Sequence, residues 1–106
     1  MARTLIHVPP NARRGEVVEI RVTIAHPMDT GFRADSLGRT VQRDLIRRFT
    51  CRYDGEVVFS VELFAAMAAN PYLAFPLQAQ ASGSLSFTWE GDRGFMQTET
   101  RDFVVA

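Results

Sequence analysis

Apolar and polar residues alternate along most of the chain. Between positions 16 and 25, Val18, Ile20, Val22 and Ile24 occupy one face of an extended strand, and mostly polar residues occupy the other. A repeat of two is typical of β-strands that bury one face and expose the other. The pattern predicts seven strands, at residues 3–8, 16–25, 46–53, 56–63, 72–80, 84–90 and 95–104.

Short turn-forming sequences separate these strands. Asp54-Gly55 stands between two alternating runs, and this pair readily adopts the positive φ angles of a type I′ hairpin. Ser82-Gly83 and the segment 91–94 mark two more connections. Seven short antiparallel strands predict an all-β fold, an immunoglobulin-like β-sandwich formed as one domain by residues 1–106. A small closed barrel is the competing architecture.

In the run 56–63, the alternation continues and places Val57 on the apolar face that is expected to be buried. Two other segments break the pattern. The alanine-rich segment 65–69 favours one or two turns of helix, ended by Asn70-Pro71 because proline disfavours helical geometry in the residue before it. Residues 26–45 show no sustained period, and loops of this length in compact domains are usually functional or disordered.

Composition excludes several classes of protein. Twelve arginines and no lysine balance twelve acidic residues, and a formal net charge of zero does not favour nucleic-acid binding. No run of apolar residues approaches the length of a membrane-spanning helix. The first ten residues lack the apolar stretch of a secretory signal, so we expect a cytoplasmic protein or one that is exported together with another chain.

Few residues could carry chemistry. His7, His26 and Cys51 cannot by themselves form a zinc site, the common catalytic motifs are absent, and we expect no cofactor and no metal. His26 is interpreted as a turn histidine bonded to local backbone, with a pH switch or a metal contact as alternatives. Cys51 alternates with apolar neighbours and is expected to point inward as a small hydrophobe, although an intermolecular disulfide is the alternative.

Apolar residues also occur on faces expected to be polar. They are Val17, Val41, Val58, Met96 and Val104. Because zero net charge lowers self-repulsion, this distribution favours association with another β-rich subunit. A free-standing binding or adhesion module is the alternative. Such modules usually present exposed aromatic residues, whereas Trp89 alternates with other apolar residues and is expected to be buried.

Several longer motifs resemble the SoxZ family, the Z subunit of the SoxYZ sulfur-compound carrier of bacterial thiosulfate oxidation. They cover nearly the whole chain in order, and HPMDTGFR and AANPYLAF are the most specific. The motifs are His26–Arg33, Ile46–Phe49, Tyr53–Phe59, Ala68–Phe75, Ser82–Leu85 and Trp89–Phe95.

The resemblance implies an immunoglobulin-like, non-catalytic subunit that forms a heterodimer with SoxY. In that family SoxY holds sulfur intermediates on a cysteine in a glycine-flanked C-terminal arm and presents them to other sulfur-oxidation enzymes in the periplasm. This chain ends at Asp102–Ala106 without such a tail, which matches the Z role. SoxZ-like proteins are thought to be exported already bound to the partner that has a signal peptide. An isolated chain is also a candidate for self-association.

Two segments are the candidates for contact with that partner. Residue types enriched at interfaces occur in the long loop and after the alanine-rich segment. We therefore predict as contact residues Met28, Phe32, Arg33, Asn70, Pro71 and Tyr72.

Overall fold

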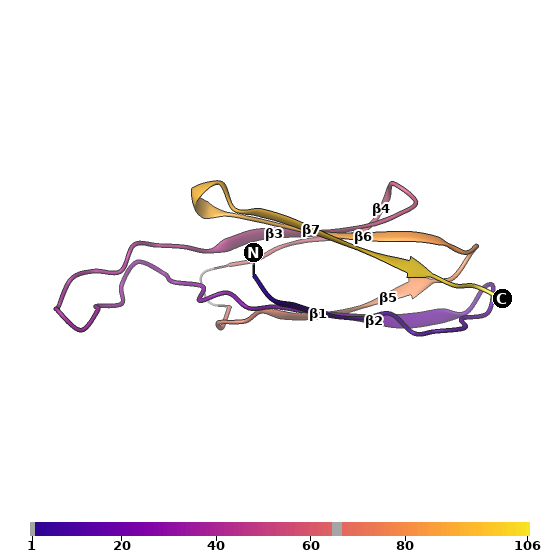
Figure 1. Cartoon of the computed structure of the whole chain (residues 1–106), viewed down its shortest axis with the longest axis horizontal. Coiled ribbons are helices and arrows are strands. Elements are labelled where there is room, and N and C mark those ends of the chain that lie inside the picture. Colours follow the sequence, from indigo (N-terminus) through magenta and orange to yellow (C-terminus); the bar gives the residue numbers. More distant parts are fainter. Residues whose placement is uncertain (1, 65–66) are drawn as a thin grey trace.

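Seven strands form two antiparallel sheets in the computed structural model, which describes residues 2–64 and 67–106 (Figure 1). The three-stranded sheet has the order β1-β2-β5 and the four-stranded sheet the order β4-β3-β6-β7. The elements are β1 (Thr4–His7), β2 (Val17–Ile24), β3 (Ile46–Tyr53), β4 (Glu56–Glu62), β5 (Tyr72–Gln78), β6 (Gly83–Gly91), the single-turn 3-10 helix η1 (Asp92–Gly94) and β7 (Met96–Phe103). The predicted β-sandwich is confirmed, and each predicted strand has its counterpart.

Aromatic side chains fill the space between the sheets. Phe49 of β3 is fully buried, and its ring centroid lies 5.2 Å from that of Trp89 and 5.9 Å from that of Phe75. Phe59 of β4 and Phe75 of β5 stack at 4.2 Å, which joins the two sheets through their edge strands. Each such side chain contributes roughly 1.5–3 kcal/mol when fully buried. Burial of the apolar faces of the strands therefore stabilises the sandwich, which we call the body.

The face predicted for Val57 is wrong. Cys51 pairs with Phe59, but the next residue of β3, Arg52, pairs with Val57, so one extra residue is accommodated in β4. This β-bulge reverses the alternation toward the start of the strand and leaves Val57 half exposed beside Arg52.

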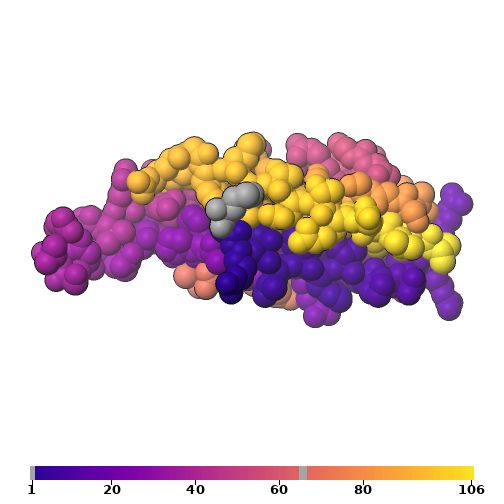
Figure 2. Space-filling model, viewed as in Figure 1, coloured from indigo at the N-terminus to yellow at the C-terminus, as the bar shows by residue number. Residues whose placement is uncertain are grey.

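The segment between β2 and β3 is a paired hairpin rather than an irregular loop. We call residues 26–45 the arm, and Figures 1 and 2 show it projecting beyond one end of the sandwich. Asp29 and Asp44 exchange two backbone hydrogen bonds of 2.9 and 2.8 Å, and nearer the tip the Val41 N–H donates to the Arg33 carbonyl at 2.7 Å. The arm gives the molecule its elongated shape of 56 × 20 × 20 Å.

The alanine-rich connection differs from the prediction where it is described. Ala65 and Ala66 lie outside the described residues, and residues 67–70 contain no helix. The Met67 N–H donates to the Phe64 carbonyl at 2.9 Å. In the described part of the chain, no helix combines the length and apolar character needed to cross a membrane.

Candidate functional site: the arm and its base

The predicted contact residues fall into two groups. Phe32 and Arg33 on the arm are exposed, as are Asn70 and Tyr72 at the start of β5, and the Phe32 side chain is 93% accessible. Met28 and Pro71 are buried in the isolated chain. The contact role of all six residues stays a prediction.

The two segments predicted to contact the partner meet at the base of the arm. The His26 N–H donates to Asn70 Oδ1 at 2.9 Å, and the Asn70 N–H donates to the His26 carbonyl at 2.7 Å. We call residues 26–34 the outgoing leg of the arm and residues 40–45 its returning leg. The reciprocal pair joins the outgoing leg to the connection between β4 and β5, which is 44 positions later in the chain.

His26 organises the outgoing leg from inside. Its side chain is only 5% exposed, Nδ1 accepts the Met28 N–H at 3.0 Å, and Nε2 lies 3.5 Å from Asp44 Oδ1 on the returning leg. The ring also meets Phe95 edge-on, with 5.5 Å between centroids. The predicted role of a turn histidine bonded to local backbone is confirmed. Met28 also ties the arm to β3, because its Sδ accepts the Ile46 N–H at 3.3 Å.

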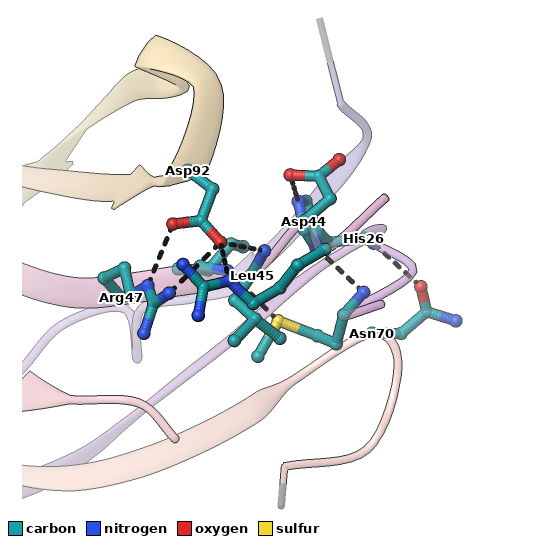
Figure 3. A network of polar contacts seen from close by, with 9 residues as sticks. His26, Asp44, Leu45, Arg47, Asn70 and Asp92 are labelled. Atoms are coloured by element: carbon teal, nitrogen blue, oxygen red, sulfur yellow. Dashed lines mark hydrogen bonds and ion pairs between the residues drawn. The ribbon is translucent and has the colours of Figure 1, made fainter. Parts of the chain in front are cut away.

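Asp92 organises the returning leg from the turn between β6 and β7 (Figure 3). Its Oδ2 accepts the Leu45 N–H at 3.0 Å, its Oδ1 accepts from Arg47 Nε at 3.0 Å, and its N–H donates to the Leu45 carbonyl at 2.8 Å. Arg43 Nε lies 3.7 Å from Oδ2. The hydrogen bond from Arg47 is the main reason that the pKa of Asp92 is lowered.

The turn also lies very close to the returning leg, because Gly91 approaches the backbone of Leu45. A Cβ atom added to Gly91 would lie 2.5 Å from the Leu45 carbonyl oxygen, so only glycine permits the approach. The sequence predicts a turn at residues 91–94, but nothing in it indicates the role of Asp92. Its partners lie 45 and 47 positions away, and no local pattern signals them.

Charged pairs run along the arm itself. Arg33 Nε donates to Asp29 Oδ1 at 2.8 Å and Arg39 Nε donates to Asp35 Oδ2 at 3.0 Å. Asp35 Oδ1 also accepts the N–H groups of Leu37 and Arg39, each at 2.9 Å, which closes the tip. The bond from Arg33 lowers the pKa of Asp29, and the Arg39 backbone N–H is the main cause of the lowered pKa of Asp35.

The body offers little reactive chemistry in its described part. Cys51 is a free, buried cysteine, as predicted, and burial raises the pKa of its thiol to about 12. Among the described residues, no group of three or more His, Cys, Asp or Glu side chains could hold a metal ion. Trp89 is buried as expected, whereas Met96 and Val104 of the last strand are exposed.

By its architecture, the protein is an immunoglobulin-like β-sandwich with sheets of three and four strands and a projecting arm. The family model for Sulphur oxidation protein SoxZ matches residues 6–102. Since this match spans nearly the whole chain, the chain belongs to the SoxZ family, and the resemblance found in its motifs is confirmed. Membership places it among the subunits of sulfur-oxidation carriers.

Solved structures with the same fold include two kinds of protein. The superoxide reductase (neelaredoxin) from Ignicoccus hospitalis is 16% identical with a TM-score of 0.73, over 99% of this chain and 82% of that chain. The sulfur carrier protein SoxY from Chlorobium limicola f thiosulfatophilum is 15% identical with a TM-score of 0.68, over 97% and 78%. Such likeness shows the fold alone. Among curated proteins, none matches the sequence significantly.

Proposed function

We propose that this chain is the non-catalytic scaffold subunit of a SoxYZ-type heterodimer, whose SoxY-type partner carries sulfur intermediates covalently on its own cysteine. The family match over residues 6–102 carries this proposal. The buried thiol of Cys51 supports it, because a thiol that stays protonated is a poor nucleophile and does not compete for the cargo. A tightly packed sandwich suits a subunit that supplies a stable docking body.

The site of action that goes with this proposal is the periplasm, reached by export in complex with a partner that has a signal peptide. There the loaded heterodimer would make transient contacts with other sulfur-oxidation enzymes. In the absence of its partner, the chain would pair with a second copy, because large apolar side chains such as Phe32 and Leu37 are exposed.

Four exposed residues are proposed to contact the SoxY-type subunit: Phe32, Arg33, Asn70 and Tyr72. Aromatic and arginine side chains are enriched at protein interfaces. Their placement supports the proposal, because hydrogen bonds between His26 and Asn70 hold the two segments side by side.

The test mixes the full chain with the SoxY-type subunit and measures complex size by light scattering, then the mass of each chain after sulfur loading. We expect a 1:1 complex in which added sulfur is found only on the partner's cysteine. Phe32→Ala and Tyr72→Ala should each weaken capture of the partner, whereas Val17→Ala, at the opposite end of the sandwich, should not. A chain that gains sulfane sulfur without its partner would contradict the scaffold role. Unchanged capture by both aromatic variants would remove the contact site only.

A further inference from the structure

The arm bears two large apolar side chains that are mostly exposed to solvent. Phe32 is 93% and Leu37 73% accessible, and both stand on the projection seen in Figure 2. Single exposed apolar residues are common on protein surfaces. Two large ones on the same projecting element resemble the anchor residues found at the centre of protein interfaces.

No hydrophobic core within the arm fixes its position. Residues 29–44, all of which the structure describes, include no buried side chain. Backbone pairing and the ion pair between Asp35 and Arg39 keep its legs together. Isolated two-stranded hairpins are marginally stable at best, so the direction in which the arm points must be set where it joins the sandwich.

At that junction, one side chain ties the returning leg to the rigid body. Asp92 accepts hydrogen bonds from Leu45 and Arg47 and attracts Arg43, and its backbone completes a reciprocal pair with Leu45 (Figure 3). The Asp92 side chain is 18% exposed, which leaves its charge only partly screened by water. Asp92 directly follows β6, an inner strand of the four-stranded sheet, so this tie connects the arm to that sheet.

We infer that the arm is a pre-ordered docking element whose Phe32 and Leu37 side chains contact the SoxY-type subunit, and that Asp92 positions its returning leg. This inference rests on the proposed function. A pre-ordered arm binds more tightly because less conformational entropy is lost when the complex forms. Asp92 touches no partner in this arrangement and acts only through the direction and order of the arm.

Asp92→Asn tests the positioning role in the full chain. The carboxamide keeps the shape of the side chain but removes its charge, so attraction to Arg43 and Arg47 is lost. We expect the amides of residues 33–41 to exchange hydrogen faster while those of β3 and β6 are unchanged, and affinity for the SoxY-type subunit to fall by about tenfold. Asp102→Asn, which removes an exposed charge from β7, is the matched control and should change neither. Arg47→Gln disrupts the same tie from its other side, should Asp92→Asn fold poorly.

A double-mutant cycle separates positioning from general destabilisation. Phe32→Ala with Leu37→Ala should weaken binding by about thirtyfold or more and leave the order of the arm intact. Adding Asp92→Asn to that pair should weaken binding no further, because the positioned contacts are already absent. Full additivity would overturn the role of Asp92, as would faster exchange of the arm with unchanged affinity. If the unaltered chain does not bind the SoxY-type subunit, the proposed function itself fails. If it binds and all arm variants bind equally well, only this inference fails.

Discussion

In the sandwich, Phe49, Phe87 and Trp89 have almost no exposed surface, whereas no side chain between residues 29 and 44 of the arm is buried. The body is therefore held mainly by apolar burial and the arm mainly by hydrogen bonds and ion pairs. Burial of a large side chain is worth roughly 1.5–3 kcal/mol, while an exposed ion pair is worth about 0–1 kcal/mol. The arm can thus be reshaped without unfolding the body, as the docking role proposed for it requires.

The largest expected effect comes from making the same substitution in both regions. Phe49→Ala removes a ring that meets those of Phe59, Phe75 and Trp89, and we expect it to lower the free energy of unfolding by about 3–5 kcal/mol. Phe32→Ala removes a ring that is almost wholly in water and should change it by less than about 0.5 kcal/mol. Urea titrations that follow the fluorescence of Trp89, the single tryptophan, measure both.

Equal losses from the two variants would contradict the division into body and arm. A large loss from Phe32→Ala alone would mean that the ring packs against the protein in solution, and the arm would then have to fold back on the sandwich.

The same division explains what sequence reasoning could recover. Alternation reports directly which side chains are buried, so the strands that contain Ile20, Phe49 and Trp89 were predictable residue by residue. It failed at Val57, because a bulge in β4 changes the register without any local signal in the sequence.

The arm escaped this reasoning for a different physical reason. Its legs pair through backbone groups, as between Asp29 and Asp44, and both of its faces meet water, so its side chains need no period. Its length indicated a loop that is either functional or disordered, and no pattern in the sequence predicted that it is ordered. The contacts of Asp92 depend on residues 45 and 47 positions away, which only the folded chain brings together.

We expect a thiol in the body and a thiol in the arm to differ about a thousandfold in reactivity. Burial raises the pKa of Cys51 from 9.0 to about 12, which lowers the thiolate fraction near pH 8 by about a thousandfold. A second thiol introduced by Ser36→Cys at the exposed tip of the arm should react with a disulfide reagent at the rate of a free thiol. Stopped-flow absorbance with Ellman's reagent measures both rates in one protein, and denaturant should make them equal. Rapid native labelling of Cys51 would show that the body opens or that its thiol is accessible to cargo.

The smallest expected effect is a loosening of the arm by acid. Asp29, Asp35 and Asp92 have pKa values below the ordinary 3.8, because hydrogen bonds from arginine side chains or backbone favour their ionised forms. A depressed pKa means that the ionised group stabilises the folded arm above pH 3.8, and that this contribution disappears as the pH falls through the lower folded-state value. Between about pH 4 and pH 2, amide resonances of the arm should therefore broaden or shift before those of the body, by a severalfold change in local opening at most.

Two comparisons sharpen this last prediction. Sodium chloride at about 1 M should loosen the arm at neutral pH in the same direction, since it screens exposed pairs such as that of Arg33 with Asp29. The Asp92→Asn variant should be looser at neutral pH and should respond less to acid, because one of the three titrating groups is gone. If arm and body instead lost their order together across the same pH range, charge would be holding both regions, and the contrast between an apolar body and an electrostatic arm would be false.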